Sequence, residues 1–313
     1  MTDINISIII PHYNIPDMLE RLLLSSPFDK DDVEVIVVDD KSERDIDKLL
    51  EVKKRFENSG VRFFRNNSEK KGAGICRNIG LKHASGQWII FADADDCFMP
   101  GMYETVKRYI DSRSDIVFFE SKSMDENGNR TDGRAEGYNR KVENYTADPN
   151  RRNELLLRYD MPVPWGKMYR RKVIEENGIW FPDMMVSEDA VFNCKFGCAA
   201  DKISVADEKI YIVTERENSL STKRSTYKFR LQVNAFAQMC RFIKKNVSSE
   251  DWRELGFNGN LKMIEAFRNF GILWALYVFF VFTVNGICPV SFKGMSLKTA
   301  PETLRKISEG RSI

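Results

Sequence analysis

The sequence is poor in the residues that build zinc sites. Only two histidines, His12 and His83, occur in 313 residues, and the six cysteines are scattered along the chain. The closest pair, Cys194 and Cys198, has no histidine near it in the sequence. A zinc site is therefore not expected, and the cysteines are better explained as reduced thiols of a cytoplasmic protein.

Long hydrophobic segments are also scarce. The amino terminus, MTDINISIIIPHYN, has no basic region and only a short apolar stretch, so no signal peptide is expected. The segment from Asn269 to Phe292 carries no charge, and within it Phe270–Val284 is almost wholly apolar. A spanning helix needs about 20 such residues, and a span would place the basic tail outside, against the positive-inside tendency. We predict a helix in the interface of an anionic membrane; the alternative is a buried core helix or a dimer helix.

The chain as a whole has almost no net charge, but its two parts carry opposite net charges. The net charge is +2, and the 42% hydrophobic and 30% charged residues are typical of a soluble globular protein. Residues 222–313 hold 15 Lys and Arg against 6 Asp and Glu, a net charge of +9, which leaves −7 for residues 1–221. We expect two domains: an acidic one over 1–221 and a basic, helical region over 222–313 that meets an anionic surface.

Short apolar runs alternate with helical patterns in the front half of the chain. The runs are rich in β-branched residues and suit strands that are buried on both faces of a parallel sheet. The predicted strands are Ile4–Pro11, Val33–Asp40, Val61–Phe64, Trp88–Ala92 and Asp115–Phe119; the predicted helices are Ile15–Ser26, Asp45–Phe56 and Ala73–Gly86, with Gly86 ending the last. This alternation predicts an α/β fold with a mostly parallel sheet flanked by helices. Residues 121–150 are polar and predict a hairpin or a mobile loop.

Polar side chains follow three of the predicted strands. Pro11–Asn14 follow the first, Asp39 and Asp40 end the second, and the run DADD, with Asp93, Asp95 and Asp96, follows the fourth. Ligands of open parallel sheets bind outside the carboxyl ends of the strands, so these clusters predict one site. Clustered carboxylates with few histidines suit Mg²⁺ or Mn²⁺, and such a metal takes one or two carboxylates together with substrate phosphates. The alternative is a solvated acidic loop, or a cap of the helix after Pro100.

Four segments, in order and spacing, resemble glycosyltransferase family 2. They are ISIIIPHYN, VEVIVVDDKS, GAGICRNIGLKHASGQWIIFADADD and VSEDAVFN, and the resemblance covers Ile4–Ser221. It implies a GT-A fold over 1–221, followed by a helical C-terminal extension. It also implies an inverting, metal-dependent hexosyl- or N-acetylhexosaminyltransferase that uses a nucleotide-sugar, by family habit a UDP-sugar. The acceptor would be a glycan or lipid-linked glycan in the synthesis of a surface polysaccharide, such as capsule or lipopolysaccharide.

The resemblance also implies roles for residues that match the family's donor-binding positions. Pro11 and Tyr13 would hold the base, Asp40 would hydrogen-bond it, Arg77 would lie near the base or diphosphate, Asp93 would face the ribose or donor sugar, and Asp95 would ligate Mn²⁺ or Mg²⁺. Asp96 is typical of the family but receives no role. The sequence departs from the family at His12, where small residues are common, and at Lys41, where glycine is common.

Inverting transfer needs one base that takes the proton from the attacking hydroxyl, and a charge that neutralises the departing diphosphate. The match of VSEDAVFN makes Asp189 this base, with Glu188 beside it. The alternative for the pair is a helix start after Ser187, where acidic residues are favoured, and the two roles are compatible.

The segment VPWGKMYRR matches a family segment near the sugars. Trp165 would stack on a sugar and Lys167 would meet a phosphate or Glu188; the alternative is a core tryptophan and a surface lysine. Arg216 and Ser219 match positions that line the donor site.

Three other functions fit parts of the pattern. A haloacid-dehalogenase-type phosphohydrolase would use Asp93 as nucleophile, but residue 97 is cysteine and its motif belongs on the first strand. A nucleotidyltransferase would want a glycine-rich loop where this chain has PHYN, and a membrane scaffold would leave Asp95 and Asp189 unexplained. We therefore expect a transferase at the cytoplasmic face of the membrane. A homodimer is compatible with the sequence, and nucleic acid is not expected as a partner. The donor sugar, acceptor, linkage and oligomeric state stay open.

Overall fold

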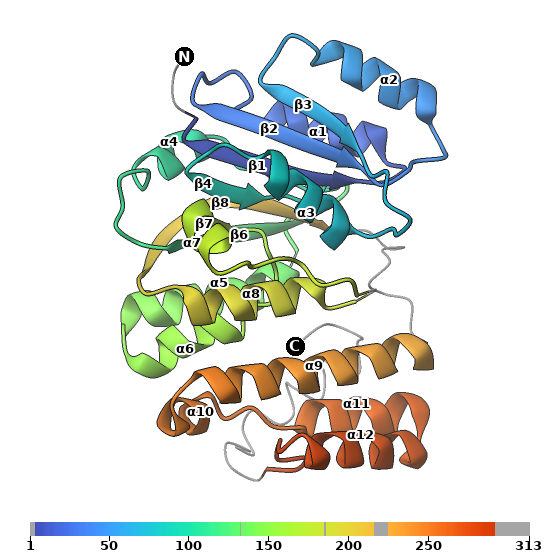
Figure 1. Cartoon of the computed structure of the whole chain (residues 1–313), viewed down its shortest axis with the longest axis vertical. Helices are drawn as coiled ribbons and strands as arrows, with labels where there is room; N and C mark the ends of the chain where they lie inside the picture. The colour runs from blue at the N-terminus through green and yellow to red at the C-terminus, as the bar shows by residue number, and fades with distance from the viewer. Residues whose placement is uncertain (1–3, 132, 185, 216–224, 292–313) are drawn as a thin grey trace. The chain divides into compact units, whose positions relative to one another are not determined.

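The computed structural model describes residues 4–131, 133–184, 186–215 and 225–291 (Figure 1). The chain divides into two compact units, residues 1–216 and 217–313, and each has its own hydrophobic core. The predicted boundary between Ser221 and Thr222 lies outside the described residues, as do Arg216 and Ser219.

The first unit is built on an eight-stranded sheet with the order β3-β2-β1-β4-β7-β6-β8-β5. The strands are β1 (Ile6–His12), β2 (Val33–Asp39), β3 (Val61–Arg65), β4 (Trp88–Phe91), β5 (Cys97–Phe98), β6 (Ile116–Asp125), β7 (Lys167–Arg170) and β8 (Ile203–Glu215). The helices are α1 (Pro16–Ser25), α2 (Ile46–Arg55), α3 (Ala73–His83), α4 (Met102–Lys107), α5 (Arg134–Ala147), α6 (Arg151–Tyr159), α7 (Arg171–Glu176) and α8 (Glu188–Ala199).

The front half of the sheet is parallel, as the sequence predicts. β1 pairs in parallel with β2 and β4, and β2 pairs in parallel with β3. Every residue of β1, β2 and β4 is buried, because both faces of the sheet are covered. The chain reverses its direction across the sheet after β3, so right-handed crossovers place α1 and α3 on opposite faces (Figure 1). The reversal falls between β1 and β4, and parallel sheets bind ligands outside the carboxyl ends of the strands at such a point.

The back half of the sheet is mixed. β7 is antiparallel to β4 and β6, and β5 is antiparallel to β8, whereas β6 and β8 run parallel. The prediction of a hairpin or loop over 121–150 is correct only for the first part of this range. β6 continues to Asp125, and the chain then turns back so that Arg130 pairs antiparallel with Met124. The prediction is wrong for the rest, where α5 forms. The prediction that Gly86 ends α3 is also wrong. Gly86 instead lets the chain approach β1, where an added Cβ would lie 2.6 Å from the Ser7 nitrogen.

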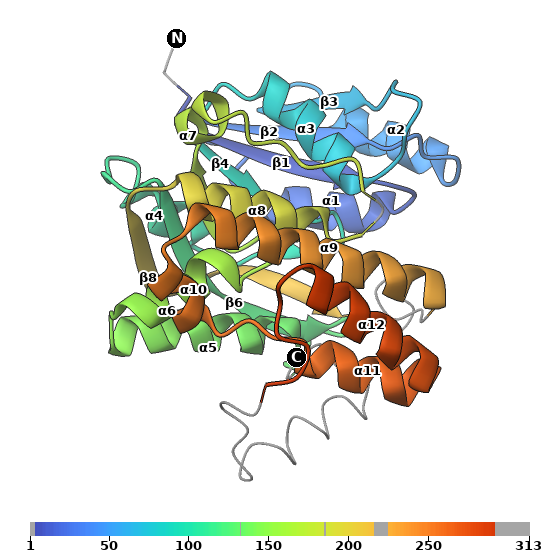
Figure 2. The ribbon, with the colours of Figure 1, turned by 60° about the horizontal axis from the view of Figure 1, so that its bottom comes forward.

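The second unit is helical over its described residues: α9 (Thr226–Asn246), α10 (Ser249–Leu255), α11 (Asn260–Phe270) and α12 (Ile272–Val284). α9 and α10 begin at Ser225 and Ser248, whose hydroxyl groups accept backbone N–H groups of the first turn. Gly271, with a φ of 87°, separates α11 from α12 near the start of the uncharged segment, and the two helices pack side by side (Figures 1 and 2). None of the described helices combines the length and the apolar character needed to cross a membrane.

Candidate active site

One buried arginine joins two carboxylates that are far apart in the sequence. Arg77 of α3 donates from Nη1 to Asp189 Oδ1 at 2.5 Å and from Nη2 to Asp93 Oδ1 at 2.6 Å. Its side chain is only 3% exposed and lies over the ring of Phe181. Burial alone would lower the pKa of Arg77, but Asp189, Asp93 and Glu188 raise it, so the guanidinium stays charged. The sequence predicts that Arg77 lies near the base or the diphosphate, and it does not reveal this bridge.

Asp189 lies in the first turn of α8, as both sequence interpretations of this pair require. Ser187, with a φ of 64°, turns the chain into the helix, and Glu188 packs against α3, where a Cβ on Gly74 would lie 2.9 Å from Glu188 Cγ. The Asp189 side chain is 30% exposed. Burial raises the pKa of Asp189 to about 7, against the effect of Arg77 and with help from Glu188 and Asp93. A carboxylate with this pKa can accept a proton near neutral pH.

The three aspartates after β4 have different environments. Asp96 is fully buried: Oδ2 accepts from the Tyr211 hydroxyl at 2.8 Å and Oδ1 accepts from the Thr214 nitrogen at 2.7 Å. Burial, followed by the charges of Asp93 and Asp95, raises the pKa of Asp96 well above its usual range. Asp96 therefore anchors the turn to β8, and Asp93 and Asp95 remain half-buried at its surface. Nothing in the local sequence distinguishes the anchor from its neighbours.

The oxygen donors of this turn suit a hard divalent cation. Within the described ranges, no three His, Cys, Asp or Glu side chains are grouped so that they could hold a metal ion by themselves. Mg²⁺ and similar ions need only one or two carboxylates when phosphate oxygens and water complete the shell. Asp95 fits a cation of this kind bound together with a phosphate-bearing ligand, and metal binding stays a prediction.

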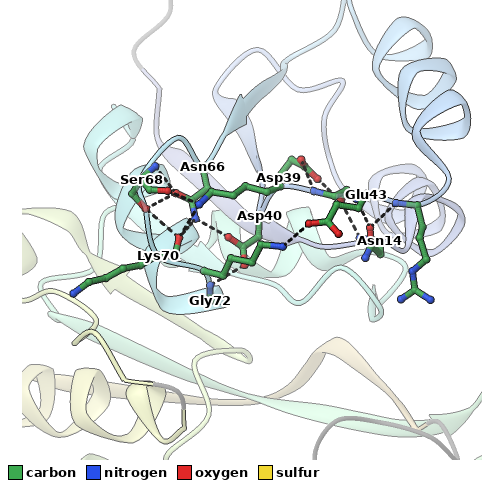
Figure 3. Close-up of polar contacts among 12 residues, drawn as sticks. Asn14, Asp39, Asp40, Glu43, Asn66, Ser68, Lys70 and Gly72 are labelled. Carbon is green, nitrogen blue, oxygen red and sulfur yellow. Dashed lines mark hydrogen bonds and ion pairs between the residues drawn. The ribbon is translucent and has the colours of Figure 1, made fainter.

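A second polar network connects the carboxyl ends of β1 and β2 to the loops that follow them (Figure 3). Asp40 accepts from Asn66 Nδ2 at 2.6 Å and from the Gly72 nitrogen at 2.7 Å, and so ties the end of β2 to the loop before α3. Asp39 accepts instead from His12 Nδ1 at 2.9 Å and from the Ser42 hydroxyl at 2.5 Å. Burial would raise the pKa of Asp39, but these donors lower it to about 2.

The network accounts for both departures from the family pattern. His12 is buried and connects β1 to Asp39. Lys41 has a φ of 60°, in the left-handed region where glycine is normally preferred. Its ammonium group donates to the backbone oxygen of Ser68, which holds the lysine in this conformation. Glycine would adopt this backbone conformation without strain.

Only one of the two residues predicted to hold the base exposes its side chain. Pro11 is buried within β1, opposite Val38. Tyr13 is 41% exposed, and Lys71 Nζ lies 5.0 Å from the centre of its ring. Tyr13 and Asp40 therefore border the same end of the sheet as Asp93 and Asp95.

Trp165 and Lys167 are buried, so neither side chain can make the contacts with a sugar or a phosphate that were predicted for it. Trp165 is 1% exposed and stacks on Tyr211 at 5.9 Å, so stacking on a sugar is wrong and the core alternative is correct. Lys167 is also fully buried, and its ammonium group contacts Met161, Val163 and Asn193, so the predicted contact with a phosphate or Glu188 and the surface alternative are both wrong. Glycine at position 166 permits this burial, since its φ of 69° turns the chain between the two side chains.

Lys167 is linked to the first turn of α8 through Asn193. Its Nζ donates to Met161 O at 2.8 Å, to Val163 O at 2.7 Å and to Asn193 Oδ1 at 2.9 Å. Asn193 Nδ2 in turn donates to the backbone oxygen of Asp189 at 2.8 Å. Burial lowers the pKa of Lys167 well below its usual range. The three acceptors nevertheless need three N–H donors, which only the charged ammonium supplies.

Replacing Lys167 with methionine should lower the free energy of unfolding by about 3 kcal/mol, because buried backbone oxygens would lose their donor. Urea unfolding at neutral pH measures this loss. The control is Lys172→Met, at an exposed lysine of α7, where a change within about 0.5 kcal/mol is expected. Equal unfolding midpoints for the two variants would contradict a structural role for Lys167.

Comparisons with known proteins identify the family of the chain. A sequence model described as glycosyl transferase family 2 matches residues 7–178. The chain is 28% identical over 256 residues to the poly(ribitol-phosphate) beta-N-acetylglucosaminyltransferase TarS of Staphylococcus aureus, covering 79% of this chain and 41% of the relative. It is 31% identical over 221 residues to a poly(ribitol-phosphate) beta-glucosyltransferase of Bacillus spizizenii, covering 68% of this chain and 32% of that relative. The chain thus spans well under half the length of these curated relatives.

Solved structures show the same fold. The structure of S. aureus TarS 1–349 in complex with UDP-GlcNAc matches with a TM-score of 0.61 at 23% identity, over 99% of this chain and 82% of that one. Mannosyltransferase PcManGT from Pyrobaculum calidifontis, in complex with GDP-Man and Mn²⁺, matches with a TM-score of 0.57 at 15% identity, over 99% of this chain and 81% of that one. These matches confirm the predicted fold class, a GT-A sheet flanked by helices and followed by a helical extension. The family match covers more than half of the chain, which therefore belongs to glycosyltransferase family 2.

Proposed function

We propose that the first unit transfers a hexose or N-acetylhexosamine from a UDP-sugar to a hydroxyl group of a glycan or polyol-phosphate polymer, with inversion. One observation carries the proposal: Arg77 holds Asp93 and Asp189 together near the point where the strand order reverses. The same arginine thus contacts Asp93, which would face the donor, and Asp189, which would act as the base. A phosphohydrolase that uses Asp93 has no support in the family match.

The donor would lie along the carboxyl ends of β1, β2 and β4. Tyr13 offers an exposed ring to the base, and Asp40, although it already accepts two hydrogen bonds, keeps a second lone pair on each oxygen. Pro11 would contribute backbone only, because its side chain is buried. UDP is favoured because TarS, named above, was solved with UDP-GlcNAc.

The diphosphate would share a divalent cation with Asp95. When bound, Mn²⁺ or Mg²⁺ would neutralise the charge that develops on the departing diphosphate. Asp93, held by Arg77, would accept hydrogen bonds from sugar or ribose hydroxyl groups. Mannosyltransferase PcManGT, which was solved with Mn²⁺, supports this choice of metal by analogy.

Asp189 would act as the base. Its carboxylate would accept the proton of the acceptor hydroxyl while that oxygen attacks the anomeric carbon and the bond to the diphosphate breaks. Because the attack occurs once, opposite the leaving group, the anomeric configuration inverts. Glu188 adjoins the base and would contact the acceptor or the donor sugar.

Two relatives point to a polyol-phosphate polymer as the acceptor. Both are named for poly(ribitol-phosphate), a polymer whose repeating unit carries free hydroxyl groups. A polyol-phosphate polymer is therefore the first acceptor to test, and a lipid-linked glycan of the cytoplasmic leaflet is the second.

A transfer assay tests the proposal. The purified chain is incubated with Mn²⁺, poly(ribitol phosphate) and UDP-GlcNAc, UDP-glucose or, as control, GDP-mannose, and release of the nucleoside diphosphate is measured. We expect release from one UDP-sugar that depends on the acceptor, with a β-linked product visible by NMR. An α-linked product would contradict inversion, and release from GDP-mannose alone would contradict the UDP donor.

A further inference from the structure

α12 is apolar on all sides but covered on only one. Its inner face, formed by Ala275, Val278, Val281 and Phe282, is buried in the core of the second unit. A helix that is hydrophobic all round is normally buried all round. The opposite face is instead exposed, with side chains between 46% and 76% accessible: Ile272, Leu273, Leu276, Phe279, Phe280 and Val284.

These exposed residues form one continuous strip. They recur at spacings of three and four along the thirteen residues of α12, which places them on one side of the helix. The one polar residue on that side is Thr283, whose hydroxyl donates to the Phe279 backbone oxygen and is thus satisfied within the helix. Single exposed apolar residues are ordinary, but a contiguous patch of large ones marks an interaction surface.

Positive charge lies at the carboxyl end of this strip. Arg241 of α9 donates to Asn285 Oδ1, and Lys244 Nζ donates to the Gly286 backbone oxygen at 3.2 Å, so both cations reach the residues directly after α12. Lys245 follows on the same exposed turn of α9. In the sequence, no Asp or Glu occurs between Glu265 and Glu302.

We infer that the α12 strip binds the surface of a bilayer that contains anionic lipids. An apolar helix face bordered by cations matches the two layers of such a surface, acyl chains below and anionic headgroups above. α12 is about 20 Å long, too short to cross the hydrocarbon core, and so would lie in the plane of the interface. A second copy of the chain is the weaker occupant, since it would bring another region with a net charge of +9 against this one.

Vesicle flotation tests the inference independently of any transferase activity. The full chain is mixed with vesicles of phosphatidylcholine, with or without phosphatidylglycerol, at low and at high salt. The test variant is Leu273→Ser/Leu276→Ser/Phe280→Ser. Its matched control is Leu24→Ser/Leu50→Ser, which removes two exposed leucines from α1 and α2 of the first unit. Circular dichroism confirms that both variants remain folded.

We expect the wild type and the control to float with anionic vesicles, and the triple variant to lose at least about 30-fold in partition coefficient. High salt or omission of phosphatidylglycerol should weaken binding of the wild type. Wild type that stays off anionic vesicles, or a folded triple variant that binds like the control, overturns the inference. Light scattering covers the rival: a wild-type dimer that becomes monomeric in the triple variant, without vesicle binding, assigns the strip to a second copy.

Discussion

Replacing Asp189 with asparagine is expected to lower kcat by about 10³-fold, because the amide cannot accept the proton of the attacking hydroxyl. The fold should persist, since asparagine has nearly the same shape and can still accept from Arg77. Steady-state release of UDP in the transfer assay measures the effect. The control is Asp29→Asn, an exposed aspartate that should keep wild-type activity.

The same variant gives a pH signature. Burial raises the pKa of Asp189 to about 7, and the base works only when it is deprotonated. The wild-type rate should therefore fall about tenfold per pH unit below 7 and level off above it. The residual rate of Asp189→Asn should lack this limb. A variant that keeps kcat within tenfold, or keeps the acid limb, would contradict the role of Asp189 as base.

Replacing Arg77 with methionine is the second large change we expect. Two carboxylates would lose their shared buried cation, and breaking a buried ion pair in this way costs about 3–5 kcal/mol of unfolding free energy. The loss of Arg77 also removes the group that lowers the pKa of Asp189, so the acid limb should move to higher pH. Urea unfolding and the pH–rate profile measure the two effects.

Two further variants make the Arg77 result specific. Arg55→Met removes an exposed arginine paired with Glu20 and should cost less than about 1 kcal/mol. Arg77→Lys keeps the charge but cannot bridge two carboxylates in the same way, so its stability should lie between wild type and Arg77→Met. If Arg77→Met is as stable as Arg55→Met and its pH–rate profile is unshifted, the Arg77 bridge contributes neither to stability nor to the pKa of Asp189.

The elements that the sequence predicted well have strong local patterns. The apolar, β-branched runs of β1, β2 and β4 are readable because every residue in them is buried. α5 was missed because only Ala135, Tyr138 and Val142 of its fourteen residues are buried, and turn-forming residues precede it. β7 was missed because its antiparallel pairing depends on strands distant in sequence.

The site shows the same limit. The positions of Asp93 and Asp189 follow from strand and helix ends, which the sequence marks. Their connection through Arg77 depends on how α3, β4 and α8 meet, which no local pattern records. Lys167 was misplaced because a lysine is rarely buried without compensating acceptors, and its acceptors, two backbone oxygens and Asn193 Oδ1, form no pattern in the local sequence.

The most direct test of the account is calorimetric titration of the chain with UDP, with and without Mn²⁺, for the wild type, Asp95→Asn and Asp189→Asn. The account predicts that UDP binds the wild type and Asp189→Asn alike when Mn²⁺ is present. Omission of the metal, or Asp95→Asn, should weaken binding by about tenfold or more. Binding of UDP that depends on neither Mn²⁺ nor Asp95, or no binding of UDP at all, would contradict a metal-assisted nucleotide site at the end of β4.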